Sequence, residues 1–383
     1  MPYFNHSFGN ASSRNHSLGW EAEEAVEHAR DEVAKLVGVN PKEIIFTSGA
    51  TEADNLALKG VFEMYASKGN HIITCNIEHR AVLDTCNHIE KKGGEVTVLQ
   101  VNDNGLIDPN ELEAAIKPNT ILIAVMCANN EIGTIMPLQE ISDIAKKRGI
   151  LVFSDATQAV GKIPIDVNKI GVDLMAFTAH KMYGPKGVGA LYIRRKNPRV
   201  KLTAQMDGGG HEKGVRSGTL NVPGIVGFGK ACEICRTEMM EEASRLSKLR
   251  DKLETGLLKL EEAYLNGDRE HRLPHMTNIS FKHVEAEGLM MGINKNIALS
   301  SGSACTSASL EPSYVLKALG LTDDMAHSSL RFGLGRNTTV EEIEYTIEQV
   351  TTTVKKLRER SPLWEMYKSG IDLNSMQSVS KGS

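Results

Sequence analysis

Hydrophobic and polar positions follow two different periods along the first two-thirds of the chain. Apolar positions recur with helical spacing over Glu21–Leu36 and Glu52–Lys68, which predicts two amphipathic helices. Short apolar runs of the kind that form buried strands alternate with helical segments. These runs are Glu43–Phe46, His71–Thr74, Glu95–Leu99, Thr120–Met126, Ile150–Phe153 and Val172–Phe177. The alternation predicts an α/β sheet with helices on both faces.

The last third of the chain has a different pattern. A loop-like stretch, Gly208–Pro223, is followed by a long charged helix over Ile225–Glu262. Two further strands and a helix are expected at Thr277–Phe281, Ser328–Gly333 and Val340–Arg358. We therefore expect a large domain over residues 1–237 and a smaller α+β domain over residues 238–383, with the boundary inside the long helix.

The composition is that of an ordinary globular protein. Of 383 residues, 41% are hydrophobic and 24% are charged, and the net charge of −4 gives no reason to expect binding to nucleic acid or an anionic membrane. Met1–His6 has neither a basic nor an apolar leader, and six cysteines do not make a disulfide scaffold, so we expect a cytoplasmic protein. We interpret the pair Cys232 and Cys235 as two incidental thiols on a helix face.

A lysine and a carboxylate stand at the ends of two expected strands. Asp155 follows the run Ile150–Phe153, and Lys181 follows Val172–Phe177. A lysine amine can form an imine with the aldehyde of pyridoxal phosphate (PLP), and a carboxylate can keep its pyridine nitrogen protonated. Taken singly, Asp155 could instead be a helix cap, and a Thr-x-His-Lys match such as that at Lys181 is common by chance. The spacing allows one crossover between neighbouring strand ends, so the pair predicts a PLP site.

Other residues fit around such a cofactor. Ser48–Glu52 opens a helix with small residues and a Thr51 hydroxyl, which suits a phosphate, although a plain capping box is the alternative. Gln158, one turn beyond Asp155 if that segment is helical, could reach the phenolic oxygen. His79 follows a strand and could stack on the ring and move protons, or be an ordinary loop histidine.

Three residues suggest the substrate. Asn130 follows a buried strand, where its amide contacts cofactor or substrate or makes an Asx turn. Arg331 is flanked by apolar residues and needs an anionic partner, either a substrate carboxylate or a structural salt bridge. Cys305 lies in a Ser, Gly and Ala-rich stretch that we expect to be a mobile loop able to carry a thiol into the site. Together these features suggest sulfur chemistry on an amino acid.

These motifs resemble the cysteine desulfurases of the class V aminotransferase family, and most closely their housekeeping iron–sulfur-assembly (IscS-type) group. The resemblance is carried by SGATEADN (48–55), EHRAVLD (78–84), NNEIG (129–133), SDATQAVGK (154–162), AHKMYGPKGVGA (179–190), RSGTLNVPGIVG (216–227), SSGSACTSASLEPSYVL (300–316) and HSSLRFGLGR (327–336). It implies the fold-type I architecture of PLP-dependent transferases. That fold has a large domain with a mixed, mostly parallel sheet flanked by helices, and a smaller α+β C-terminal domain.

The resemblance also implies a role for each matching residue. Lys181 would form the imine, Asp155 would contact the pyridine nitrogen, Gln158 the phenolic oxygen, and His79 would stack on the ring. Phosphate and other cofactor contacts would come from Ala50, Thr51, Asn130, Thr178 and His180, with Thr219 from the neighbouring subunit of a homodimer. Asn130 and Arg331 would hold the substrate. Cys305 would take the sulfur and could transiently ligate a nascent iron–sulfur cluster, with no resident metal.

The implied activity is the conversion of L-cysteine to L-alanine and a Cys305 persulfide. The sulfur would serve iron–sulfur cluster assembly and tRNA thiolation. A scaffold protein would dock at the tail (about 361–383), and other sulfur-acceptor proteins would also be partners. Cys305 would lie in a mobile loop at about 300–312. Alternatives are another PLP reaction, such as transamination or selenocysteine lysis, and a non-catalytic binding module. The family pattern includes an additional N-terminal segment that lines the active site, so we expect the chain as written to fold less stably and turn over poorly.

Overall fold

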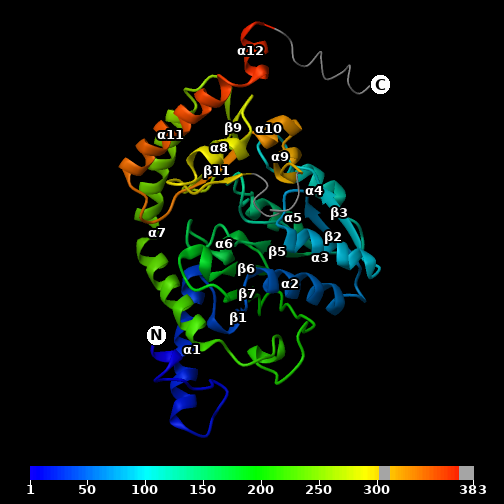
Figure 1. The fold of residues 1–383 in the computed structure, drawn as a ribbon. Coiled ribbons are helices and arrows are strands. Elements are labelled where there is room, and N and C mark those ends of the chain that lie inside the picture. Colours follow the sequence, from blue (N-terminus) through cyan, green and yellow to red (C-terminus); the bar gives the residue numbers. More distant parts are fainter. Residues whose placement is uncertain (302–310, 371–383) are drawn as a thin grey trace.

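The computed structural model describes residues 1–301 and 311–370 and shows two sheets, each with its own helices (Figure 1). The larger sheet has seven strands in the order β1-β7-β6-β5-β4-β2-β3, and the smaller has four in the order β10-β11-β9-β8. This confirms the expected fold class, a mixed and mostly parallel sheet flanked by helices together with a smaller α+β unit. In these described ranges, no helix is both long enough and apolar enough to cross a membrane.

The strands of the large sheet put six carboxyl ends at one edge. The strands are β1 (Ile44–Thr47), β2 (His71–Cys75), β3 (Glu95–Leu99), β4 (Thr120–Ala124), β5 (Leu151–Asp155), β6 (Leu174–Thr178) and β7 (Gly189–Ile193). β2, β4, β5 and β6 pair in parallel, and β7 is antiparallel to both β6 and β1. Because β7 runs opposite to both neighbours, β1 points the same way as β6. β3 also pairs in parallel with β2, so the ends of all six strands from β1 to β6 share one edge of the sheet.

Helices cover both faces of this sheet and bury two apolar clusters. They are η1 (Pro2–Phe4), α1 (Ser17–Val37), η2 (Pro41–Glu43), α2 (Ala50–Met64), α3 (Arg80–Lys91), α4 (Pro109–Ala115), α5 (Leu138–Lys147), α6 (Val167–Ile170), η3 (Ala179–Met182) and η4 (Glu212–Gly214). α2 and α3 pack over one cluster, and α1, α4 and α5 over the other. α1 begins where the His16 ring accepts a hydrogen bond from Gly19 N–H and ends at Gly38, which has a left-handed φ of 74°.

The long helix α7 (Val222–Leu257) joins the two packing units. Cys232 and Cys235 on its first half are buried in the core of the large sheet, which agrees with their interpretation as helix-face thiols, while Leu246–Leu257 belongs to a third cluster under the small sheet. We propose that these units are the two domains, with the boundary at residues 237–238. The small unit contains β8 (Ala263–Asn266), β9 (Met276–Phe281), α8 (Ala286–Ile293), β10 (Ser300–Ser301), α9 (Tyr314–Ala318), α10 (Asp323–His327), β11 (Ser329–Gly333), α11 (Val340–Arg358) and α12 (Pro362–Lys368).

Candidate active site

One edge of the large sheet gathers most of the residues singled out from the sequence. Asp155 is the last residue of β5, and its neighbour across the β5–β6 pair is Ala176. Lys181 lies in η3, directly after β6, and His79 stands at the start of α3, four residues beyond β2. Asn130 follows β4. Because these strands are parallel, their carboxyl ends form the crevice where open α/β sheets bind their ligands.

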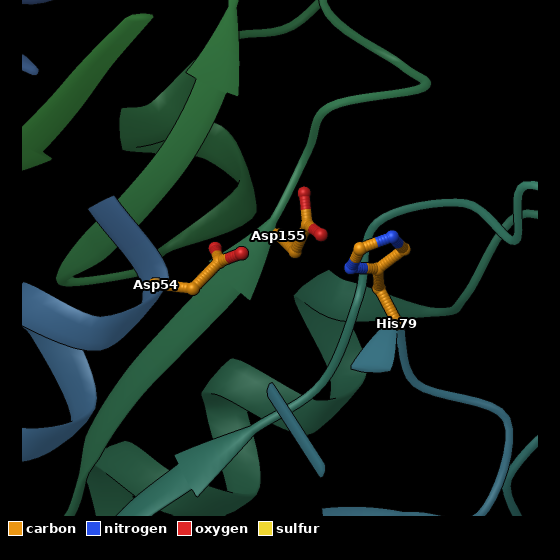
Figure 2. Close-up of side chains that lie close together, drawn as sticks. All are labelled: Asp54, His79 and Asp155. Atoms are coloured by element: carbon orange, nitrogen blue, oxygen red, sulfur yellow. The ribbon is translucent and has the colours of Figure 1, made fainter. Parts of the chain in front are cut away.

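Asp155 and His79 face one another across this crevice (Figure 2). The Asp155 side chain is buried, and its Oδ1 accepts a hydrogen bond of 2.9 Å from Thr157 N–H. The His79 Nδ1 accepts one of 3.1 Å from Ala81 N–H, which fixes the ring at the start of α3. One ligand atom from each of Asp54, His79 and Asp155 lies within 4.8 Å of the other two.

Asp54 and Glu78 were quoted in the motifs but given no role in the sequence analysis. Burial, followed by the charges of Asp155 and Glu78, raises the pKa of Asp54 well above its ordinary value. A neutral carboxyl is a poor metal ligand, so the spacing of this trio does not by itself indicate a metal site. The sequence did carry a signal. Asp54 precedes Leu58 and Val61 by four and seven residues, so it stands on the apolar stripe of α2.

The first turn of α2 is open for an anion. Gly49 is the N-cap of α2, and no side chain of the described residues caps the first N–H groups of this helix. Glu52 instead reaches back to the N–H of Ser48 at 2.8 Å, so the complete capping box considered above is not formed. A β-carbon added to Gly49 would lie 4.0 Å from the Thr178 Oγ1, so the start of α2 adjoins the end of β6. The unpaired N–H groups there suit a phosphate.

Positive charge and hydroxyl groups surround this helix start. The Thr178 hydroxyl donates to the carbonyl of Val188 at 3.1 Å and lies 3.1 Å from the Nδ1 of His180. Desolvation, and then the charges of Lys181 and Lys186, lower the pKa of His180. His180 and Lys181 are exposed on the single chain, as is Thr51, whereas Thr178 is buried. The basic end of the site is therefore open in one copy of the protein.

Arg331 reaches the same crevice from the small sheet. Its Nη1 donates to the carbonyl of Asn130 at 2.7 Å, and its Nη2 donates to the Ser300 hydroxyl at 3.2 Å. Both acceptors are neutral, and no carboxylate of the described residues lies within salt-bridge distance of Arg331, although burial raises the pKa of Glu131 and the Arg331 charge opposes this rise. The Asn130 Oδ1 is buried and has no hydrogen-bond partner in the described ranges. A substrate carboxylate would satisfy Arg331, and a ligand donor would satisfy Asn130.

All the site roles remain predictions, and three of the expected residues lie outside the groups described above. Cys305 lies outside the described residues. The residues before it end in β10, where Ser300 pairs with Arg331, and beyond it the Tyr314 hydroxyl donates to the Glu78 carbonyl at 2.6 Å. Gln158 is half-buried in a series of turns rather than in a helix, and Thr219 is exposed between η4 and α7.

The sequence matches the model of the aminotransferase class-V family over residues 1–346. The chain belongs to this family. The cysteine desulfurase IscS of Escherichia coli O139:H28 is 58% identical over 371 residues, which cover 97% of this chain and 91% of that relative. The cysteine desulfurase IscS of Shigella boydii serotype 18 gives the same values. These identities confirm the resemblance that the motifs indicated.

Solved structures of class-V aminotransferase relatives share the fold. A NifS-like protein is 38% identical with a TM-score of 0.86, and the match covers 92% of this chain and 93% of that one. A second structure, of SspA in complex with cysteine, is 34% identical with a TM-score of 0.78, and the match covers 88% and 94% of the two chains. At these identities the likeness extends to the family as well as the fold.

Proposed function

We propose that the chain is a PLP-dependent cysteine desulfurase, which converts L-cysteine to L-alanine and a persulfide on Cys305 and so supplies sulfur for iron–sulfur cluster assembly. The observation that carries this proposal is that the crevice has an acidic end and a basic end. Asp155 marks a buried acidic end, and His180, Lys181 and the start of α2 mark a basic end. A relative with that activity in its name is 58% identical along nearly the whole chain.

The residues present fit PLP. The open first turn of α2, with Ala50 and Thr51, would bind the phosphate together with Thr178 and His180, and Thr219 of the partner subunit would close the exposed side. Lys181 would hold the cofactor covalently, Asp155 would hold the pyridine nitrogen, Gln158 the phenolic oxygen and His79 the ring face. When bound, PLP supplies an electron sink for a substrate carbanion.

The other residues bind the substrate and move its atoms. Arg331 would hold the L-cysteine carboxylate with two parallel N–H donors, beside the Asn130 amide. The Lys181 amine and the His79 ring would take and return protons. The Cys305 thiolate would form a bond to the substrate sulfur as the carbon–sulfur bond breaks. A proton delivered to the substrate carbon then completes alanine, so that the sulfur leaves on Cys305.

The proposal also includes a homodimer and the binding of partner proteins. The exposure of His180 and Lys181 supports a homodimer in which a second copy completes the phosphate site. In the proposed tail, Trp364 stacks on Tyr367 at 5.2 Å between ring centroids, and the Arg358 guanidinium lies 4.4 Å from the Trp364 ring. The described part of the tail thus packs on its own domain. We propose that residues 371–383, outside the described ranges, dock the scaffold protein, and that other sulfur acceptors use the same cytoplasmic enzyme.

The test is a mass measurement on protein loaded with PLP and treated with L-cysteine. We expect one added sulfur atom on the peptide that contains Cys305. Cys305→Ser should keep the cofactor absorbance and lose both the added sulfur and turnover. Normal turnover in Cys305→Ser would refute the role of this thiol, and formation of a keto acid instead of alanine would indicate transamination.

A further inference from the structure

Asp54 is a buried acid that the proposed mechanism does not use. It lies in the first half of α2 with no exposed surface, and neither carboxyl oxygen has a hydrogen-bond partner in the described part of the chain. Its neighbours on the same helix are satisfied. Glu52 pairs with Arg216 at 2.8 Å, and the Asn55 amide donates to the Thr51 carbonyl at 2.9 Å. An unpartnered buried acid in a native protein calls for an explanation.

The surroundings of Asp54 favour its neutral form. Burial raises its pKa well above the ordinary value, and the charges of Asp155 on β5 and Glu78 before α3 raise it further. The remaining strands packed against α2 present apolar side chains, among them Ala124 on β4, Ala176 on β6 and Leu191 on β7. The His79 ring also lies within 4.8 Å, but the charges that act on the Asp54 carboxyl are those of the two acids. The buried carboxyl therefore keeps its proton and becomes a hydrogen-bond donor.

Asp155 is the acceptor that lies toward this donor. Figure 2 shows the Asp54 carboxyl pointing at Asp155, which stands between Asp54 and His79. The nearest ligand atoms of the two acids are within 4.8 Å. The other acid, Glu78, already accepts hydrogen bonds at its Oε1 from the Met126 N–H and the Cys75 thiol.

We propose that Asp54 is a protonated acid that donates a hydrogen bond to Asp155 and so positions the carboxylate that faces the cofactor nitrogen. This inference rests on the proposed cofactor site. Asp155 would then be held by two donors from opposite sides, the Thr157 N–H and the Asp54 hydroxyl. A carboxylate fixed in this way has its remaining acceptor capacity directed toward the crevice. Asp54 is thus a positioning residue, which acts on the cofactor only through Asp155.

Two variants separate this role from simple packing. Asp54→Asn keeps the shape and an N–H donor but has no acidic proton, whereas Asp54→Leu removes the donor and fills the space. Glu52→Gln, two residues away on the same helix, is the matched control because the pKa of Glu52 is lowered and its carboxyl is ionised. Infrared spectra of the cofactor-free proteins report the carbonyl band of a protonated carboxylic acid. We expect this band to weaken in both Asp54 variants and to stay unchanged in Glu52→Gln.

A second readout is the binding of PLP itself. In Asp54→Leu the Kd for PLP should rise about tenfold or more, the loss typical of a hydrogen bond to a charged group, and the pH midpoint of the bound-cofactor absorbance should shift. Asp54→Asn should restore both. The melting temperature of cofactor-free Asp54→Leu should not fall, because a buried acid has been replaced by an apolar side chain.

Each unfavourable result has a distinct meaning. If neither Asp54 variant weakens the band, or if Asp54→Leu binds PLP with an unchanged Kd and pH midpoint, the inference is wrong. A band that depends on Asp54 in a protein that forms no persulfide would leave the proton on Asp54 established and refute the desulfurase function instead. Persulfide formation without that band would refute only the role of Asp54.

Discussion

The two ends of the candidate site are built in opposite ways. At the acidic end, Asp54 and Asp155 are buried, and backbone turns and helix packing fix their positions within one chain. At the basic end, His180 and Lys181 are exposed, and the first turn of α2 is left without a side-chain cap from the described residues. One end is thus complete in a single copy, and the other is open.

The difference follows from the cost of burying charge. An acid can be buried when it takes up a proton, so a single chain can enclose the acidic end without a counter-ion. Lysine amines and the N–H groups of a helix start keep their favourable interactions only in contact with water or an anion. The structure therefore suggests that the acidic end is preorganised, whereas the basic end is completed by the phosphate and a second subunit.

The largest loss of activity should come from a substitution of Lys181 at the basic end. Lys181→Ala removes the amine that holds the cofactor and moves protons, and we expect alanine formation to fall about a thousandfold or more. The absorbance of the lysine-linked cofactor should disappear while PLP still binds through the phosphate. Lys186→Ala, which changes a nearby positive charge, is the control. Loss of activity of equal size in both variants would show that bulk charge, and not the Lys181 amine, defines this end.

Variants of Arg331 test whether the substrate binds between the acidic and the basic end of the site. Arg331→Ala should raise KM for L-cysteine about a hundredfold, because charge-assisted hydrogen bonds to the carboxylate are lost. Arg331→Lys keeps the charge but not the two parallel donors, and its KM should be intermediate. The check is steady-state kinetics at several L-cysteine concentrations. A fall in kcat with unchanged KM would place Arg331 outside substrate binding.

The buried acids near the acidic end should make the free energy of unfolding depend on pH. Burial raises the pKa of Glu78 from 4.5 to about 8. Folded Glu78 keeps its proton up to about pH 8, but the unfolded chain loses it above its ordinary value, so unfolding releases a proton in this range. The free energy of unfolding should fall as pH rises through this window, with a contribution from Glu78 of up to about 1.4 kcal/mol per pH unit.

Urea unfolding between pH 5 and 8 measures this slope. Glu78→Gln should make it shallower, because the amide does not titrate. Glu95→Gln is the control, since Glu95 is only half-buried and its pKa is lowered by Lys117. A slope that is the same in the wild type and in Glu78→Gln would mean that Glu78 is not protonated in the folded state.

The smallest effect on activity is expected for substitutions of the two cysteines on α7, which lie away from both ends of the site. Cys232→Ala and Cys235→Ala remove thiols that are buried on one face of α7 and whose pKa values are raised by burial. Each should lower the free energy of unfolding by about 1 kcal/mol while leaving alanine formation unchanged. Activity assays and urea unfolding of the two variants would check this. A loss of turnover in either would show that the Cys-x-x-Cys pair takes part in sulfur transfer.

The sequence predicted the residues whose position depends on strand ends. Asp155 and Lys181 could be found because buried strands are visible as apolar runs, and parallel strands bring their carboxyl ends together. The helix Val340–Arg358 was predicted with its observed bounds, since a Thr339–Glu342 capping box marks its start. β7 was missed because its run Gly189–Ile193 begins with Gly and Ala, directly after a glycine-rich turn.

Other features could not be found from the sequence because they depend on contacts between distant segments. The bond from Arg331 to the Asn130 carbonyl joins the small sheet to a loop beyond β4, and the approach of Asp54 to Asp155 joins a helix to a strand end. Periodicity indicates that Asp54 faces the core but does not indicate which side chain it meets there. The role of Thr219 remains a prediction, because it depends on a second subunit.

The most direct test of the desulfurase function is L-cysteine-dependent alanine formation by the purified chain loaded with PLP, in the presence of a thiol reductant. The account predicts slow but measurable formation of alanine with one sulfide released per alanine, and loss of both in Lys181→Ala and Cys305→Ala. Absence of alanine from a protein that shows the absorbance of bound PLP would contradict the central claim.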